Sequence, residues 1–174
     1  MSQTVLITGA SNGIGKACAR VFARKGYDLV LVARHREKLE AVKAELSEYD
    51  VQIKVIAMDL TGEDAAVDLY NNLVLDDISI DILVNNAGFG DHGAFHDSSW
   101  EKQKKMVLLN IVALMQMTYV FGQSMKRRKK GRILNVASIA GLCAGPYMST
   151  YYATKAFVSV SYTHLRAHET ELHL

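Results

Sequence analysis

The chain alternates between short apolar runs and longer stretches in which apolar residues recur every three or four positions. The short runs are rich in Val, Ile and Leu, as expected for strands that are buried on both faces of a sheet. These runs predict strands at 4–8, 28–33, 51–58, 81–88 (with its turn) and 132–138. The longer stretches predict helices at 13–25, 37–49, 63–75 and 100–130, and a last helix that begins near 149–151. Strands that alternate with helices predict a parallel sheet with helices on both faces.

This pattern predicts an α/β fold, a Rossmann-like doubly wound parallel sheet with the strand order 3-2-1-4-5. Such a dinucleotide-binding sheet normally has six strands. Five are present in the pattern, so we expect the last strands to be missing. Residues 1–159 are therefore interpreted as one incomplete dinucleotide-binding and catalytic domain.

Composition and charge narrow the possible partners. The 174 residues carry a net charge of +2, which gives no overall field for nucleic acid or an anionic membrane. No apolar run approaches the roughly 20 residues of a membrane span, and no signal peptide is recognisable at the start. Two scattered cysteines fit a reducing compartment, so we expect a cytoplasmic protein. The basic run at 126–132 is interpreted as a solvated helix end.

The first predicted strand runs into the glycine-rich stretch TGASNGIG at 8–15. Glycines at 9, 13 and 15 would let the backbone approach a pyrophosphate, and the following helix would offer free N–H groups to it. Glycine-rich turns also serve tight packing alone. The strand before and the helix after this turn favour a dinucleotide site.

The end of the second predicted strand bears on the choice of cofactor. An acidic residue there would hold the ribose 2′-hydroxyl of NAD. The chain instead has Arg34, and no carboxylate occurs before Glu37. Because arginine pairs with phosphate in a bidentate manner, we expect NADP(H) to be favoured over NAD(H), with Arg34 as the contact. The alternative is a solvated basic helix start.

The last predicted helix contains the sequence YYATK, in which Tyr151 and Lys155 share a helix face. A neighbouring ammonium group would stabilise the phenolate of Tyr151, so this residue is a candidate general acid or base. Tyr152 points about 100° away around the helix. Ser138, at the end of the fifth strand, is placed to donate a hydrogen bond to a carbonyl oxygen. No metal site is expected.

Taken together, these motifs resemble those of the classical short-chain dehydrogenases/reductases. The resemblance covers about residues 3–159. The matching motifs occur in the family's order: TGASNGIG, Asp59–Leu60, NNAG at 85–88, Asn110, Ser138, and Tyr151 with Lys155.

The resemblance implies a role for each of these residues. Tyr151 would exchange a proton with the substrate oxygen, Ser138 would polarise that oxygen, and Lys155 would hold the nicotinamide ribose. Asn110 would anchor a water relay to Lys155; otherwise it is a partly exposed helix residue. The implied cofactor contacts are Gly9, Ser11, Asn12, Gly13, Ile14, Gly15, Arg34, Asp59, Leu60, Asn86, Ala87, Gly88, Tyr151 and Lys155.

The final segment differs from the rest. Residues 160–170, VSYTHLRAHET, can be back-translated into a sequence that resembles a transposon-based sequencing adapter read in frame. We therefore expect residues 160–174 to be a non-native tail, and the substrate-determining segment to be missing. The alternatives are a native surface helix, or a metal site at His164, His168 and His173.

The expected function is NAD(P)-dependent hydride transfer between the nicotinamide and a small-molecule carbonyl or alcohol substrate. The alternatives are a non-catalytic NADP(H)-binding regulatory protein, a nucleotide-sugar epimerase or dehydratase, and a fragment without activity. The resemblance also implies a homodimer or homotetramer for the full-length protein.

Overall fold

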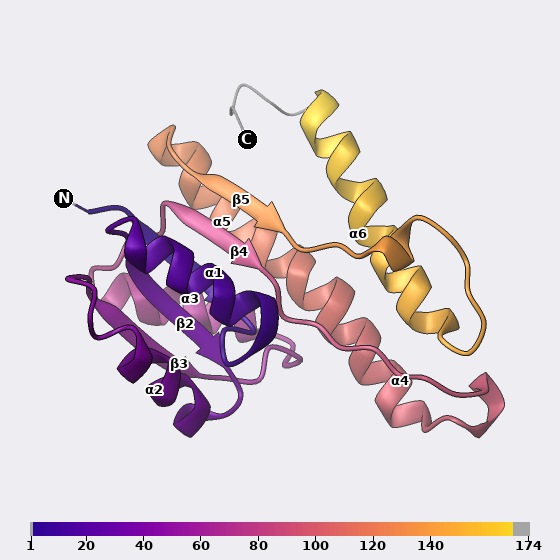
Figure 1. Cartoon of the computed structure of the whole chain (residues 1–174). Coiled ribbons are helices and arrows are strands. Elements are labelled where there is room, and N and C mark those ends of the chain that lie inside the picture. Colours follow the sequence, from indigo (N-terminus) through magenta and orange to yellow (C-terminus); the bar gives the residue numbers. More distant parts are fainter. Residues whose placement is uncertain (1, 169–174) are drawn as a thin grey trace.

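The computed structural model describes residues 2–168 of the chain (Figure 1). Its centre is a parallel sheet of five strands in the order β3-β2-β1-β4-β5, which confirms the predicted fold class and strand order. The strands are β1 (Thr4–Thr8), β2 (Asp28–Ala33), β3 (Ile53–Ala57), β4 (Ile82–Asn85) and β5 (Arg132–Asn135).

Helices connect the strands and cover both faces of the sheet. In Figure 1, α1 and α2 lie in front of the sheet, and α3 and α5 lie behind it. The α-helices are α1 (Gly13–Arg24), α2 (Arg36–Glu45), α3 (Ala65–Leu75), α4 (Trp100–Val107), α5 (Leu114–Arg128) and α6 (Ser149–His168). Shorter helical segments are η1 (Phe95–Asp97), the π-helical η2 (Leu108–Ala113) and η3 (Ile139–Gly141).

The alternation of side chains along each strand builds two separate cores. In β1, Val5 and Ile7 pack with residues of α1 and α2 on one face. Leu6 points to the opposite face and packs with α3 and α5, where Phe121 is the largest fully buried side chain. Because strands buried on both faces need apolar residues at every position, this packing explains why β1 shows no alternation of polar and apolar residues.

The predicted elements are all present, and most differences lie at their ends. The strand at 28–33 has the predicted bounds, whereas the second helix ends at Glu45 and not at residue 49. The long helix predicted for 100–130 runs from Trp100 to Arg128, but its middle turn, η2, is π-helical. A π turn inside an α-helix often marks a functional position, and Asn110 lies in this one.

The same long helix bears on the expectation that no segment of the chain is long and apolar enough to span a membrane. Within the described residues, Trp100–Arg128 is long and apolar enough to cross a membrane, with a mean hydropathy of 1.4 over an 18-residue window. A helix that covers a sheet meets the same criterion. Here Met117, Phe121 and Met125 pack into the core beside the sheet.

The predicted tail is only partly described. Helix α6 continues through His168, so residues 160–168 are helical, and residues 169–174 lie outside the described residues. The side chains of His164 and His168, and all of His173, also lie outside the description. Among the residues that are described, no group of three or more His, Cys, Asp or Glu residues is placed to hold a metal ion.

Candidate active site

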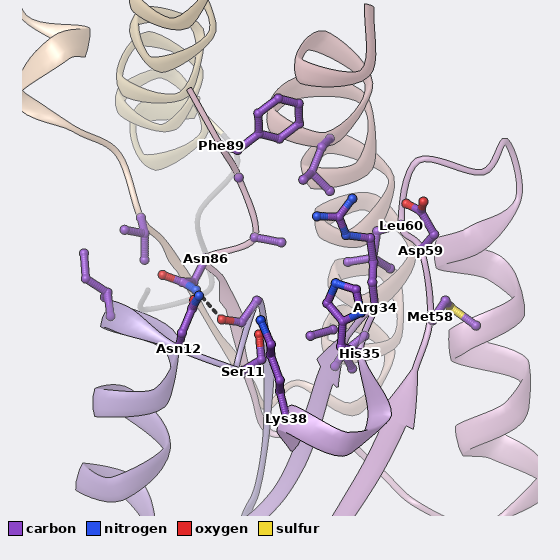
Figure 2. A pocket seen from close by; sticks show the side chains of 18 of the residues that line it. Ser11, Asn12, Arg34, His35, Lys38, Met58, Asp59, Leu60, Asn86 and Phe89 are labelled. Atoms are coloured by element: carbon purple, nitrogen blue, oxygen red, sulfur yellow. Dashed lines mark hydrogen bonds between the residues drawn. The ribbon is translucent and has the colours of Figure 1, made fainter. Parts of the chain in front are cut away.

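A cleft of about 480 Å³ opens at the edge of the sheet where the parallel strands end (Figure 2). It lies between the turn after β1, the ends of β2 and β3, the turn after β4, and α6. The chain moves outward from β1 to β2 and β3 and then crosses back to β4 and β5. In doubly wound sheets, ligands bind at such a reversal of strand order, and the cleft has the size of a ligand site.

The turn after β1 is shaped by its glycines. Gly9 has a left-handed φ of +66°, and a Cβ atom there would lie 2.9 Å from the Ala87 Cα. A Cβ on Gly15 would lie 2.4 Å from the Gly9 carbonyl oxygen, so α1 could not pack so closely on the turn with a larger residue. Gly13 also has a left-handed φ, +52°, in open space. These glycines let the backbone of the turn lie close to α1 and to the β4 turn, and they place no side chain in the cleft.

The start of α1 faces the cleft. Ser11, Asn12 and Ile14 line it, and Asn12 is the N-cap residue. The Asn12 side chain forms no capping hydrogen bond, and the first turn of α1 contains no acidic residue. The amide groups of this turn are therefore suited to an anionic group, as the sequence predicts for a pyrophosphate.

Three basic residues lie together at the end of β2 and the start of α2. Arg34, His35 and Lys38 all line the cleft; in Figure 2, Lys38 lies beside Ser11, and Arg34 lies towards Leu60 and Asp59. In the described part of the chain, neither Arg34 nor Lys38 forms an ion pair with an acidic side chain. Sequence reasoning selected Arg34 and missed Lys38. Its position four residues after Arg34, just inside the predicted helix, could have indicated it.

Asp59 and Leu60 follow β3 and line the same part of the cleft as Arg34 (Figure 2). Partial burial alone would raise the pKa of Asp59, but the amide and hydroxyl of Thr61 both donate to its Oδ1. With the nearby charges of Arg34 and Lys105, these bonds hold the pKa of Asp59 below its usual range. The carboxylate is therefore a charged acceptor at the rim of the cleft.

The turn after β4 forms the floor of the cleft with Asn86, Ala87 and Gly88. The Thr8 hydroxyl accepts hydrogen bonds from the amides of Asn86 and Ala87, each at 3.0 Å. The Asn86 side chain donates to the carbonyl oxygens of Thr8 and Gly9. Asn86 thus ties the β1 and β4 turns together, while Ala87 and Gly88 leave room because they are small.

Tyr151 and Lys155 line the cleft from adjacent turns of α6. Lys155 is only 7% exposed, and its Nζ donates to the Val136 carbonyl oxygen at 2.9 Å. Burial lowers the pKa of Lys155 from its ordinary value. Tyr152 lies elsewhere, because its hydroxyl packs against Gly145.

Asn110 lies behind the cleft, where it is 1% exposed, so the alternative of a partly exposed helix residue is wrong. Its Oδ1 accepts from the Phe89 amide at 3.1 Å. Its Nδ2 donates to the Phe89 carbonyl at 2.9 Å and to the Thr154 hydroxyl at 3.0 Å. The side chain therefore joins the β4 loop to α6, and the predicted water relay to Lys155 stays a prediction. Thr154 was missed by sequence reasoning, although it precedes Lys155.

Ser138 stands at the start of η3, and its Oγ accepts a hydrogen bond from the Ala140 amide at 3.1 Å. The segment η3 packs directly on α6: a Cβ on Gly141 would lie 2.5 Å from the Lys155 carbonyl oxygen. Ser138 is thus held on an element that is fixed to the helix of Tyr151. Because the Ser138 hydroxyl accepts this bond from Ala140, its own proton is still available for donation to another group.

A family model described as short chain dehydrogenase matches residues 3–173. The chain belongs to the short-chain dehydrogenase/reductase family. The matched range includes most of the segment at 160–174 that we expect to be non-native, and the origin of that segment stays a prediction.

Several members of this family resemble the chain closely. A very-long-chain 3-oxoacyl-CoA reductase of Bos taurus is 34% identical over 91% of the chain and 52% of its own length. A bulky-bulky ketone specific alcohol dehydrogenase of Comamonas testosteroni is 38% identical, with a TM-score of 0.87 over 94% of the chain and 66% of its own. A short-chain dehydrogenase of Sphingobium yanoikuyae, solved in complex with NADPH, is 38% identical, with a TM-score of 0.88 over 98% of the chain and 66% of its own.

The chain therefore spans about half the length of the curated relatives that it matches.

Proposed function

We propose that this protein is an NADP(H)-dependent carbonyl reductase or alcohol dehydrogenase, and that Tyr151 is its general acid and base. The observation that carries the proposal is the cleft itself. It brings the glycine turn, a group of basic side chains and the Tyr151–Lys155 pair to one edge of the sheet. The solved relatives include an alcohol dehydrogenase and an NADPH complex, which supports this choice of chemistry and cofactor.

The residues of the cleft fit a dinucleotide phosphate. Glycines keep the turn after β1 low, and the first turn of α1 offers amide groups to a pyrophosphate. Arg34 and Lys38, which form no ion pair within the described residues, suit a 2′-phosphate. When bound there, the nicotinamide supplies or accepts the hydride.

The protein's own part in the reaction is to orient the substrate and move the proton. In reduction, the Tyr151 hydroxyl donates its proton to the carbonyl oxygen; in oxidation, the phenolate removes the alcohol proton. The Ser138 hydroxyl donates a hydrogen bond to the same oxygen and withdraws charge from it. The Lys155 ammonium, held by the Val136 carbonyl, lies ready to bind a ribose hydroxyl.

A pair of tyrosine variants tests this function. Tyr151→Phe removes one hydroxyl, and we expect the rate of NADPH oxidation with a panel of ketones and 3-oxoacyl thioesters to fall about a thousandfold, as for loss of a general acid. We expect the NADPH dissociation constant to stay within about twofold. Tyr152→Phe is the matched control, since it removes the same hydroxyl one residue away, outside the cleft.

Three results would contradict the proposal. If Tyr151→Phe retained normal turnover, Tyr151 would not be the proton donor. If the full-length protein bound NADPH but turned over no member of the panel, the non-catalytic regulatory alternative would replace the enzyme. Tighter binding of NADH than of NADPH would overturn the cofactor assignment.

The location and the oligomeric state of the protein are also part of the proposal. We place the protein in the cytoplasm as a homodimer or homotetramer, which fractionation and light scattering would test. The exposed side chains of Met115 and Tyr119 on α5 are consistent with a contact between subunits. Sequencing the source locus beyond the codon for residue 159 would test whether the tail is native.

A further inference from the structure

The backbone of the loop after β4 lies directly against the ring of Tyr151. A Cβ atom built on Gly90 would lie 3.1 Å from Tyr151 Cδ2 and 3.2 Å from Tyr151 Cγ. It would also lie 3.1 Å from the Met148 Cε. Contacts this short are tighter than nine in ten that real Cβ atoms make, so position 90 has no room for a side chain unless a neighbour moves.

The two neighbours differ in how easily they can move. Met148 Cε is the free end of a flexible side chain and can turn away at little cost. Tyr151 Cγ is the ring atom nearest to the backbone of α6, so relief there requires the whole ring to shift or tilt. Gly90 lies outside the left-handed region, since it is not among the glycines with positive φ. Its lack of a side chain is therefore explained by the ring contact and not by backbone conformation.

The loop that carries Gly90 is tied down on both sides. Before it, the amide and carbonyl of Phe89 both bind the side chain of Asn110. After it, the Asp91 carboxylate, only 16% exposed, pairs with Lys102 and accepts from Gln103 Nε2 at 3.2 Å. These bonds fix the loop to η2 and to the start of α4, so Gly90 cannot simply move away from the ring.

A further bond joins the loop to the segment that leads into α6. The Gly93 amide donates to the Tyr147 carbonyl oxygen at 2.8 Å, and the His92 and Tyr147 rings lie 5.7 Å apart. Tyr147 has a left-handed φ of +61°, an uncommon conformation for a tyrosine. The loop therefore makes two contacts here, one with Tyr147 in the segment before α6 and one with the ring of Tyr151 in the first turn of α6.

We propose that Gly90 is a positioning residue for Tyr151: the anchored loop at 89–93 supports one face of the ring and sets the place of the phenolic hydroxyl. The proposal rests on the proposed role of Tyr151 as proton donor. Proton transfer requires hydrogen-bond distance to the substrate oxygen, so a small displacement of the ring lowers the rate of the chemical step.

The first test compares two glycine-to-alanine variants. Gly90→Ala forces the ring to move by a few tenths of an ångström, and we expect kcat for carbonyl reduction to fall about tenfold, since 1 Å of misplacement can cost about a hundredfold. The NADPH dissociation constant and the melting temperature should change little. Gly122→Ala is the control, because its Cβ would make an ordinary contact of 3.8 Å with Ile133 Cδ1.

The second test does not depend on turnover. With ¹³C-labelled tyrosine rings, the Tyr151 resonance is assigned by its loss in Tyr151→Phe. We expect Gly90→Ala to shift this resonance while Gly122→Ala leaves it in place.

An unchanged Tyr151 resonance in Gly90→Ala would overturn the proposal, and so would a shifted resonance with unchanged kcat. A full-length wild-type protein that binds NADPH without turnover would instead overturn the proposed function. The Tyr151 resonance would still decide whether Gly90 positions the ring.

Discussion

A single substitution of Arg34, in the group of basic side chains at the end of β2, tests the preference for NADP(H) over NAD(H). Arg34→Ala removes a guanidinium group that lines the cleft without an ion-pair partner among the described residues. A hydrogen bond to a charged group contributes about 1.5–3 kcal/mol. Arg34 is exposed, and solvent screens such pairs, so the lower value of about 1.5 kcal/mol applies. This corresponds to about a tenfold rise in the NADPH dissociation constant.

The same variant should leave NADH binding within about twofold, because NADH lacks the 2′-phosphate. The assay is a titration of cofactor fluorescence at fixed ionic strength, repeated at higher salt, where the effect should shrink. Arg36→Ala is the matched control, since Arg36 does not line the cleft and pairs with Glu40 at 3.5 Å. Equal weakening of NADPH and NADH would refute the reasoning, since Arg34 would then act through the fold and not through the phosphate.

Three other changes test the fold and the turn. Although burial alone would raise it, bonds from Lys130, the Thr4 amide and Arg128 hold the pKa of Asp81 below its usual range. Asp81→Asn should therefore lower the free energy of unfolding, measured in urea at pH 7, by about 2 kcal/mol. The difference from wild type should vanish as the pH falls below about 4, because Asp81 becomes protonated as the pH passes through its lowered pKa. A difference that persisted in acid would show that the charge of Asp81 is not its cause. Gly15→Ala should weaken NADPH binding at least about tenfold (on the order of 1.4 kcal/mol), because the new Cβ would lie 2.4 Å from the Gly9 carbonyl oxygen. An unchanged NADPH dissociation constant would show that α1 can move without cost. Phe121→Ala should lower the free energy of unfolding by about 3–5 kcal/mol, measured in urea, and a loss below about 1 kcal/mol would mean that the core refills the space.

The fold could be predicted from the sequence because its strands are buried on both faces. A strand such as β2 must be apolar at its buried central positions, Leu29–Val32, on both faces of the sheet. Helices fill the intervals between such strands, so the order of the elements could be predicted from the sequence. The ends of elements were less certain. They depend on where a chain meets its neighbours, as at the second helix, which stops at Glu45 although the apolar pattern continues.

The candidate residues of the site were also visible where local chemistry demands a particular residue type. A tight turn before a helix needs glycine, and an acid and its cation one helix turn apart need a four-residue spacing, so Gly9, Tyr151 and Lys155 could be selected in advance. Ser138 was selected differently, from its place at the end of the fifth predicted strand and from the resemblance to the short-chain dehydrogenases/reductases.

What the tertiary structure decided are the relations between segments far apart in the chain. The side chain of Asn110, in the π turn of the long helix, bonds to Phe89 in the β4 loop, 21 residues earlier in the chain. The requirement for glycine at position 90 depends on the Tyr151 ring, 61 residues later in the chain. The sequence determined the local residue types and the order of elements, because these follow from burial and backbone geometry. Contacts across the cleft follow from packing, which no local pattern encodes.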